Sequence, residues 1–587
     1  SDLTPQTQES YKLEHIAQVE LNKGKIDYSE YGNLHTLYKQ DYGKFLEYNV
    51  KDVLLIEQLE DKLGFIELTQ TMAYNAKCNY SDVFGMVKYW ETIIYNFLKD
   101  QGIQTPPPRM KTGNDKMKPI AGAYVKEPQV GGHNWVMSFD LNSLYPHLIM
   151  QFNISPEKMI MGQRQDTSVK RLLNQECDLS YVYQCDNTVT PNGVMFKRDK
   201  QGFLPELMEK FYDERKMWKK RMIEYQKEKE TCTDIKRKRE LDTLIKRAYN
   251  NQQVRKIALN SAYGALANQY FAFFSIDLAE AITLSGQYVI QHAEKVVNEY
   301  LNKVLKTDED YVIAIDTDSV YITMDKLVSQ VFPEDTPREK VIDFLSKAEK
   351  QIEDALKKGF DNLAQYTNAF QQKMEMGREV IADKGIWTAK KRYILNVYDN
   401  EGVRLAEPKL KMMGIETAKS STPQWVRKKL EEALKVVMTQ SERELWEFVE
   451  TARKEFRNLP AEEVAFPRGC KNLAQYADSS TIYTKGTPIH VRGSLLYNNL
   501  LKKKELDMRY DSIKNGSKIH FTYLTLPNPI NENVISFESV LPREFDLHRF
   551  VDYDMQFDKS FVEPLKVIVE KINWNVEPVA SLDSFFA

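Results

Sequence analysis

The stretch Tyr311–Thr323, YVIAIDTDSVYIT, is the one around which the rest of the chain is organised. Apolar residues from Val312 to Ile315 lead into Asp316-Thr317-Asp318, and Ser319 opens a second apolar run. This pattern predicts a short β-hairpin with two carboxylates at its tip. Because adjacent like charges beside a buried strand are costly unless a cation neutralises them, the tip is a candidate metal site. A solvated acidic turn is the alternative, which a lone Asp-x-Asp does not exclude.

A second stretch, Trp135–Pro146 (WVMSFDLNSLYP), supplies another carboxylate at a strand end. An apolar strand up to Phe139 delivers Asp140, and the following residues predict a turn that enters a helix. Taken alone, this Asp is equally compatible with a structural role. Together the two stretches bring three carboxylates to the strand ends of one sheet. Magnesium is often held by a few carboxylates plus substrate phosphates, and paired ions serve in-line phosphoryl displacement.

The motifs then occur in a recognisable order. DLNSLYP (140–146), KIALNSAYG (256–264) and DTDS (316–319) resemble motifs A, B and C of family B DNA polymerases. Further matches run almost the length of the chain: KKRY (390–393), EPKLKMMGIET (407–417), SSTP (420–423) and the terminal SLDSFFA. The set is similar to the replicative members of T-even-type bacteriophages. The resemblance implies template-directed DNA synthesis in phage replication and an α+β right-hand fold, with an antiparallel-sheet palm, helical fingers and a mostly helical thumb.

Composition is compatible with this assignment. A chain of 587 residues exceeds one core, so several domains are expected. We see no apolar stretch long enough to span a membrane and no signal peptide at Ser1, and we expect no membrane partner. Five cysteines without a Cys-x-x-Cys pair predict unpaired thiols in a reducing compartment. The resemblance implies the cytoplasm of an infected bacterial host.

The resemblance also implies a domain order. The expected segments are a C-terminal remnant of a 3′–5′ exonuclease domain (1–75), an N-terminal or linker segment (76–120), the first part of the palm (121–201), the fingers (202–268), the second part of the palm (269–418), and the thumb with a clamp-binding tail (419–587).

The first segment contains Tyr48 and Asp52, which resemble the family's third exonuclease motif, Tyr-x-x-x-Asp. In the family this Tyr orients the attacking water and this Asp holds a metal. The first two exonuclease motifs have no room in this chain, so we expect no nuclease activity from it alone. Either a separate exonuclease or N-terminal fragment carries the missing half, or the chain is trimmed. Apolar spacing through Val53, Ile56, Leu59 and Leu63 predicts an amphipathic helix.

For the polymerase site, the resemblance implies that Asp140 and Asp318 hold two Mg²⁺ ions, with Mn²⁺ as a substitute. The backbone carbonyl of Leu141 is a further ligand, and Asp316 has a supporting role. The N–H groups of Ser143 and Leu144, at a helix start, suit triphosphate oxygens. Tyr145 resembles the steric gate that excludes a 2′-hydroxyl, with a plain core Tyr as the alternative.

Residues 202–268 predict two helices joined by a polar turn near 231–234. Arg215 and Lys219 share one helical face, and Lys256, Asn260, Tyr263 and Gly264 share another. Most charges in this region are expected to be solvated. The resemblance implies that Arg215, Lys219 and Lys256 hold the triphosphate and offset its developing charge. It also places Asn260 and Tyr263 near the nascent base pair and Gly264 near the template.

The stretch 387–398 predicts two strands joined by the basic cluster KKRY. Its members Lys390, Lys391, Arg392 and Tyr393 take the family's place for holding the primer terminus, with Lys391 in the minor groove, where every base pair presents acceptors. In the terminal segment, Leu582, Phe585 and Phe586 resemble peptides that dock sliding clamps. The expected partners are primer-template DNA, deoxynucleoside triphosphates and a sliding clamp. Two alternatives remain: a DNA- or clamp-binding fragment active only with its missing half, and a 3′–5′ exonuclease.

Overall fold

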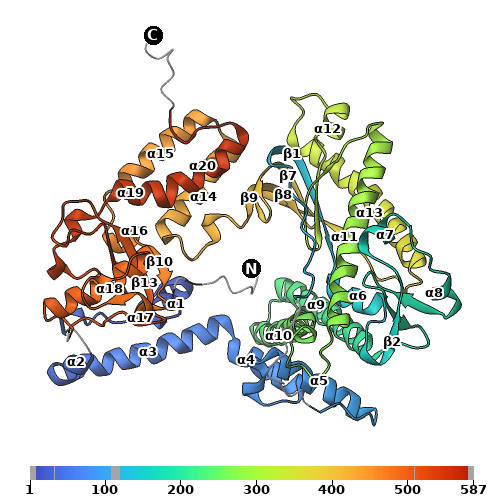
Figure 1. Cartoon of the computed structure of the whole chain (residues 1–587), viewed down its shortest axis with the longest axis horizontal. Helices are drawn as coiled ribbons and strands as arrows, with labels where there is room; N and C mark the ends of the chain where they lie inside the picture. The colour runs from blue at the N-terminus through green and yellow to red at the C-terminus, as the bar shows by residue number, and fades with distance from the viewer. Residues whose placement is uncertain (1–7, 9, 32–33, 108–118, 508, 579–587) are drawn as a thin grey trace, which may run out of the picture.

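The computed structural model describes residues 8, 10–31, 34–107, 119–507 and 509–578. It combines many helices with antiparallel sheets (Figure 1), which confirms the α+β class. In the described part of the chain, no helix is both long and apolar enough to cross a membrane. All five cysteines are unpaired, as predicted.

A six-stranded sheet forms the centre of one half of the molecule. Its order is β5-β6-β1-β7-β8-β9, and every neighbouring pair is antiparallel. The strands are β1 (Gly131–Leu141), β5 (Val312–Asp316), β6 (Ser319–Thr323), β7 (Met376–Ala389), β8 (Arg392–Asn400) and β9 (Val403–Met413). Both predicted hairpins are therefore confirmed. Before β1, an isolated antiparallel bridge joins Val125 to Asp316.

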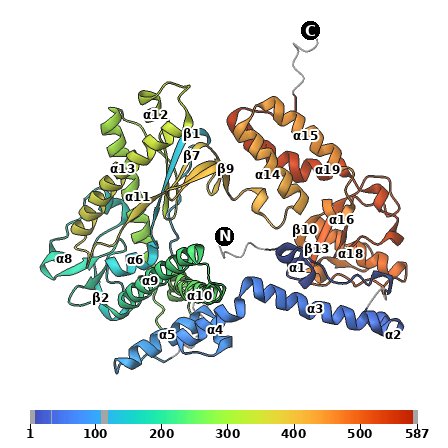
Figure 2. The same ribbon diagram turned by 180° about the vertical axis from the view of Figure 1, so that it is seen from behind.

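The two faces of this sheet have different neighbours. Met137 and Phe139 of β1 belong to a large core that also contains residues of α6 (Leu144–Gln151), α11 (Ile276–Leu305) and α13 (Arg338–Tyr366). Figures 1 and 2 show these helices along one side of the sheet. Because side chains alternate along a strand, Ser138 and Asp140 point to the opposite face. The functional candidates of β1 thus lie on the face that the helices leave uncovered.

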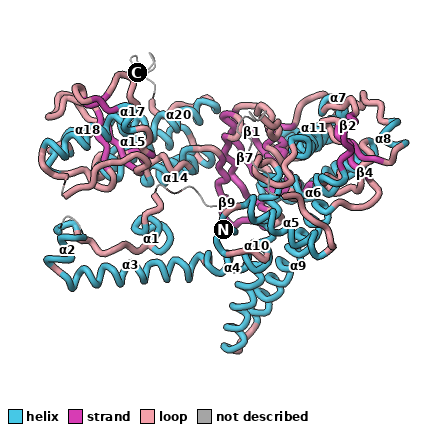
Figure 3. The backbone as a smooth tube through the Cα atoms, turned by 60° about the horizontal axis from the view of Figure 1, so that its bottom comes forward, coloured by secondary structure: helices cyan, strands magenta, loops and turns pink. Residues whose placement is uncertain are grey.

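Two long antiparallel helices, α9 (Phe203–Thr231) and α10 (Ile235–Leu266), project from this half (Figure 3). They confirm the predicted helix pair with its turn near 231–234. The next helix, α11, begins at Ile276. The side chain of Ser275 accepts a hydrogen bond from the N–H of Leu278, and this cap sets the start.

The N-terminal region is helical throughout its regular elements: α1 (Leu13–Leu21), α2 (Leu34–Gln40), α3 (Tyr42–Leu63), α4 (Phe65–Ala76) and α5 (Met86–Asp100). The predicted helix is α3, which runs between the C-terminal half and α4 (Figure 1). Its predicted apolar face is not in a core, because Val53 is 60% exposed and Ile56 57%. The buried side chains of α3 are Tyr48 and Leu55, which lie along the same side of the helix as the half-buried Leu59.

The C-terminal half, after β9, is built around a core that includes Phe456, Phe537 and Phe557 and also takes in Ile386 and Ile394 of the sheet. Its main helices are α14 (Gln424–Thr439), α15 (Glu442–Phe456), α18 (Ile489–Lys503), α19 (Tyr553–Phe557) and α20 (Glu563–Val569). The expectation of a mostly helical unit missed a three-stranded sheet of β10 (Phe466–Gly469), β13 (Lys518–Tyr523) and β14 (Val534–Phe537). A Cβ at Gly493 would lie 2.4 Å from Ser536 Oγ, so glycine lets α18 pack closely on β14.

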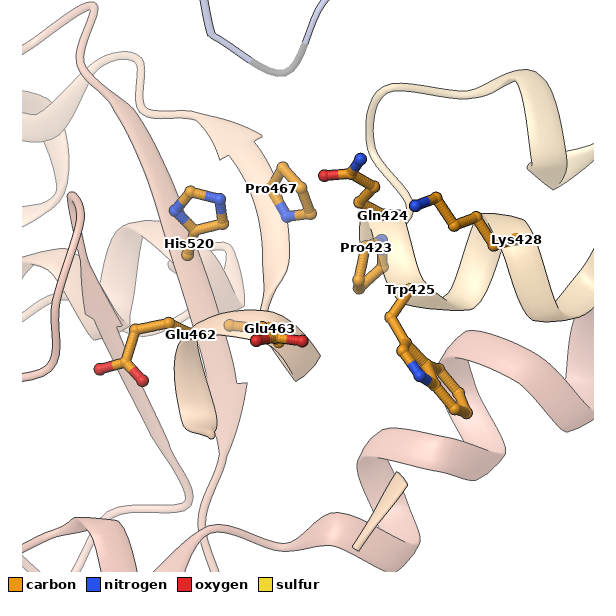
Figure 4. A pocket seen from close by; sticks show the side chains of 9 residues that line it. Pro423, Gln424, Trp425, Lys428, Glu462, Glu463, Pro467 and His520 are labelled. Carbon is orange, nitrogen blue, oxygen red and sulfur yellow. The ribbon is translucent and has the colours of Figure 1, made fainter. Parts of the chain in front are cut away.

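Helix α14 begins directly after its N-cap, Pro423. A pocket of about 420 Å³ opens between this helix start and α16 (Ala461–Val464), β10 and β13 (Figure 4). None of the candidate site residues lines it. The remaining elements are α7 (Val169–Leu173), α8 (Ser180–Gln184), α12 (Asp325–Val331), α17 (Leu473–Tyr476), β2 (Met159–Arg164), β3 (Asn187–Val189), β4 (Val194–Lys197), β11 (Ala477–Asp478) and β12 (Ile482–Tyr483).

Candidate active site

The sheet brings the carboxylates of the two sequence stretches together. Asp140, near the end of β1, lies opposite Ser319 in the register with β6. Ser319 Oγ donates a hydrogen bond to Asp140 Oδ1 at 2.6 Å across 179 sequence positions. The N–H of Leu141 donates to the carbonyl of Asp318 at 2.9 Å. The end of β1 and the hairpin tip are therefore joined by two hydrogen bonds.

The charges at this point are unfavourable in the absence of a cation. Burial raises the pKa of Asp318 to about 7, and the neighbouring Asp140, Asp316 and Glu379 add to the rise. Burial also raises the pKa of Asp140, against which the Ser319 hydrogen bond acts. Two neighbouring, largely buried carboxylates thus disfavour each other's ionised form.

Lysines form ion pairs only with the outer members of this group. Lys391 Nζ lies 3.2 Å from Asp316 Oδ1, and Lys411 Nζ lies 2.7 Å from Glu379 Oε2. Within the described ranges, no Lys, Arg or His forms an ion pair with Asp140 or Asp318. The charge of Lys411 acts on Asp140 from a distance and opposes the rise of its pKa.

Glu379 is a residue that sequence reasoning missed. The pairing of β1 with β7 shifts register between Ser138 and Phe139, which leaves Glu379 as the extra residue of a β-bulge. Its carboxylate accepts hydrogen bonds from Lys411 and from Ser138 Oγ, at 3.2 Å in the second case. Glu379 stands in a strand with no motif around it, so only the register reveals its proximity to the aspartates.

The donor set fits an ion that arrives with a phosphate ligand. Across the residues that the structure describes, no group of three or more His, Cys, Asp or Glu side chains forms a metal cage. Magnesium needs no such cage, because one or two carboxylates plus water and substrate phosphates complete its shell. Asp140 and Asp318, with the carbonyl of Leu141 beside them, supply such a partial set.

The turn after Asp140 leads into α6. Ser143 has a left-handed backbone (φ 48°) and does not cap α6 through its side chain. The first N–H groups of a helix have no carbonyl partner within it, and they suit phosphate oxygens. The turn therefore presents candidate donors at Ser143 and Leu144 next to the paired carboxylates.

Tyr145 of α6 packs against residues of two other helices, α10 and α11. Its ring centroid lies 4.9 Å from that of Tyr263 on α10. A Cβ at Gly286 of α11 would lie only 3.3 Å from Tyr145 Cε1, so glycine makes room for the ring. Burial raises the pKa of Tyr145 to about 12, with Asp318 among the charges that contribute. The ring is thus held near the carboxylates in a single position.

The helix pair contributes cations from two sides. On α9, burial lowers the pKa of Arg215, and its buried Nε has no hydrogen-bond partner among the described residues. Lys219 is exposed one turn further along α9. An unpartnered buried guanidinium nitrogen is costly, which favours an anionic ligand at Arg215.

On α10, Lys256 and Asn260 border a groove of about 410 Å³ that Phe65 and Leu68 of α4 line on the other side. Gly264 is exposed, and a Cβ there would meet nothing within 4 Å. The predicted face of α10 is therefore accessible at Asn260 and Gly264, while Tyr263 reaches the site through its contact with Tyr145.

The KKRY hairpin divides into a charged tip and a buried base. Lys390 pairs with Glu127 at 3.3 Å, and Arg392 pairs with Glu416 at 2.9 Å. Lys391 is the member that reaches the aspartates, through Asp316. Tyr393 is only 3% exposed and shares a 2.7 Å hydrogen bond with Tyr321. Tyr393 thus lies inside the sheet unit, and its side chain is not exposed for the predicted contact with DNA.

The candidate exonuclease remnants lie in the N-terminal region. Lys25 Nζ pairs with Asp52 at 2.7 Å and lies 4.7 Å from the ring centroid of Tyr48. A lysine therefore occupies the place beside Asp52 that a metal would need. The three candidate clamp-binding residues, Leu582, Phe585 and Phe586, lie outside the described residues.

Comparisons with known proteins agree with the motifs. The model of "DNA polymerase family B" matches residues 75–467. The DNA-directed DNA polymerase of Escherichia phage RB69 is 35% identical over 99% of this chain and 68% of its own length. That of Enterobacteria phage T4 is 34% identical over 98% of this chain and 68% of its own length. DNA polymerase 1 of Pyrococcus abyssi is 28% identical over 48% of this chain.

Proposed function

This chain belongs to DNA polymerase family B, and we propose that its six-stranded sheet carries the site where a primer strand is extended. The protein is a template-directed DNA polymerase of the kind that replicates phage DNA. The observation that carries the site assignment is the meeting of Asp140 and Asp318 without a cationic partner.

The proposed layout is that of a right hand. The sheet unit is the palm, formed by 121–201 and 269–418, and the helix pair within 202–268 is the fingers. The C-terminal half, 419–587, is the thumb. The division of thumb from palm is supported by a second core, which lies mainly in the C-terminal half and also takes in Ile386 and Ile394 of the sheet. Residues 1–75 and 76–120 are the exonuclease remnant and the linker segment.

Two Mg²⁺ ions, or Mn²⁺ in their place, are the proposed cofactors, with Asp140, Asp318 and the Leu141 carbonyl as ligands. Bound there, such ions lower the pKa of the primer 3′-hydroxyl and offset charge on the α-phosphate. Asp316 has a supporting role: its ion pair with Lys391 reduces the negative charge next to the two ligand carboxylates. Asp140 and Asp318 would together hold the ions in place next to the reacting atoms.

The remaining residues bind and orient the deoxynucleoside triphosphate. Ser143 and Leu144 offer backbone N–H groups to its phosphates, and Arg215, Lys219 and Lys256 supply positive charge from the helix pair. Tyr145, fixed by Tyr263 and Gly286, lies beneath the sugar and leaves no room for a 2′-hydroxyl. The orphaned Nε of Arg215 supports an anion at this position.

DNA contacts follow from the same geometry. Lys391 lies beside the carboxylates and is the proposed minor-groove probe at the primer end. Lys390 and Arg392 exchange their carboxylate partners for DNA phosphates. Asn260, Tyr263 and Gly264 face the nascent pair and the template; the open space at Gly264 supports a close approach.

Two further protein partners are proposed. The tail residues Leu582, Phe585 and Phe586 bind a sliding clamp. A separate exonuclease or N-terminal fragment covers α3, whose large apolar side chains Leu46, Val50, Val53 and Ile56 are exposed. The proposed location is the cytoplasm of an infected bacterium. The pairing of Asp52 with Lys25 gives no support to a nuclease acting alone.

Replacing Asp318 with Asn tests the assignment. The variant keeps the side chain's shape and removes one ligand charge, so primer extension with Mg²⁺ is expected to fall at least a thousandfold, on the scale of losing a main electrostatic contact of the transition state. Primer-template affinity is expected to stay within about twofold. Extension at the wild-type rate would refute the role of Asp318.

A further inference from the structure

Asn142, which directly follows Leu141, is held by partners from outside its own segment. Its side-chain amide donates a hydrogen bond to Tyr212 Oη on α9 at 2.5 Å. Its backbone N–H donates to the carbonyl of Glu375 at 3.2 Å. The turn that leads from the carboxylates into α6 is therefore anchored on one side to the sheet unit and on the other to the helix pair.

His147 adds a second connection between the same two elements. Its Nδ1 lies 3.0 Å from the carbonyl of Ser143, to which it donates. Its ring meets that of Tyr212 edge to face, with centroids 4.5 Å apart. Tyr212 thus contacts both the residue that precedes Ser143 and the imidazole that holds Ser143. His147 is 6% exposed, so this contact lies in the interior.

Tyr212 also stands next to the cations of α9. It precedes Arg215 by three positions, which places both on one side of the helix. Lys216 Nζ lies 5.0 Å from the ring centroid of Tyr212. Tyr212 is therefore hydrogen-bonded to the turn and shares one side of α9 with Arg215, so it stands next to both groups of proposed triphosphate donors.

We infer that Tyr212 is a positioning residue for nucleotide binding, which acts through its hydrogen bond to Asn142. The inference rests on the proposed function of the turn and of Arg215. Both donor groups must reach the same triphosphate, so a link that fixes their separation organises the site before the ligand binds. Tyr212 itself does not touch the substrate.

Replacing Tyr212 with Phe removes the hydroxyl and keeps the ring on His147. The contacts of Asn142 with Glu375 and of Ser143 with His147 remain, so the fold is expected to stand. In single-nucleotide incorporation on primer-template DNA, KM for the nucleotide is expected to rise about two- to tenfold, the worth of one hydrogen bond. The value of kcat and the affinity for primer-template are expected to stay within twofold.

A double-mutant cycle separates the link from general damage. Asn142→Ala removes the other half of the bond, and the Tyr212→Phe/Asn142→Ala double variant is expected to raise KM no further than the larger single effect. Tyr225→Phe, on the same helix and outside this network, is the matched control and leaves KM unchanged. Additive effects in the cycle, an equal rise in Tyr225→Phe, or an unchanged KM in Tyr212→Phe would each overturn the inference.

The outcome is distinguishable from a failure of the proposed active site. If Asp318→Asn extends primers normally, the site itself is wrong. If Asp318→Asn is inactive and Tyr212→Phe binds nucleotide like the wild type, the site stands and the positioning role of Tyr212 falls.

Discussion

At the scale of single residues, Tyr145 is the clearest case of a side chain that its neighbours fix. Tyr263 contacts its ring, and Gly286 leaves only enough room for it. Tyr145→Ala is therefore expected to raise ribonucleotide incorporation relative to deoxyribonucleotide about ten- to two-hundredfold, the range for one small group in a fitted pocket. Tyr145→Phe, which keeps the ring, is expected to discriminate like the wild type. Unchanged discrimination in Tyr145→Ala would remove the gate role.

Asp318 predicts a pH dependence of stability in metal-free protein. Its pKa of about 7 in the folded chain exceeds the ordinary 3.8, so the unfolded chain ionises first as pH rises. The carboxylate therefore destabilises the fold progressively between about pH 4 and pH 7, and fully above it. With chelator at pH 8, Asp318→Asn is expected to raise the free energy of unfolding by up to about 4 kcal/mol, at 1.36 kcal/mol per unit.

The same comparison at pH 4 is its internal control, because Asp318 is then protonated in the folded chain and close to half protonated in the unfolded chain, so most of the gain is lost. Chemical denaturation at the two pH values measures the difference. Equal stability of Asp318→Asn and wild type at pH 8 would show that the carboxylate carries no such strain.

How much of the site the sequence predicts depends on whether a residue belongs to a local motif. Asp140, Asp318 and Tyr145 stand in short patterns that place them at strand and helix ends. Glu379 and Tyr212 do not, since their relation to the site comes from a bulge and from a contact between distant helices. Burial is equally hidden: nothing in KKRY distinguishes the interior Tyr393 from its exposed neighbours.

At the scale of elements, an interior ion pair joins α9 and α10. Arg255 Nε lies 2.8 Å from Glu214 Oε2, and the Arg255 side chain is only 10% exposed. Arg255 also donates to Asn75 of α4 at 3.0 Å, which extends the link to a third helix. The pair therefore holds the base of the projecting helices, close to Arg215 and Lys256.

Glu214→Ala is expected to lower the free energy of unfolding by about 3 kcal/mol, because it leaves a buried guanidinium without its carboxylate. Asp242→Ala is the matched control: it removes the partner of Lys229 in an exposed pair between the same two helices. Such pairs contribute at most about 1 kcal/mol. Thermal denaturation checks both variants. Similar shifts in the two would mean that burial of the Arg255 pair has no energetic consequence.

Periodicity identifies elements well and their surroundings poorly. The hairpin at 311–323 and the pair α9/α10 follow their patterns closely. In contrast, α3 has the spacing of a packed helix while Val53 and Ile56 face solvent. The strands β10, β13 and β14 were missed because short strands among helices give a weak periodic signal.

At the scale of the whole molecule, the account depends on chain topology. Asp140 arrives on β1 and Asp318 on the tip between β5 and β6, and only the antiparallel sheet joins them. The sheet continues through β7 and β8, and the turn between them brings Lys391 to Asp316. The long helices α9 and α10 extend in another direction (Figure 3) and contain Arg215, Lys219 and Lys256, the proposed nucleotide-binding cations. Residues far apart in sequence thus form one charged site with two unmatched carboxylates.

Counting the bound metal ions is the most direct test of this claim. Mn²⁺ would be titrated into wild type and into an Asp140→Asn/Asp318→Asn variant, and electron paramagnetic resonance would measure the free and bound ion. Each sample would contain a primer-template whose primer ends in a dideoxynucleotide, together with the next nucleotide. The account predicts about two tightly bound ions per wild-type complex and loss of both in the variant, apart from weak binding to the nucleotide alone. Two tightly bound ions in the variant would contradict it.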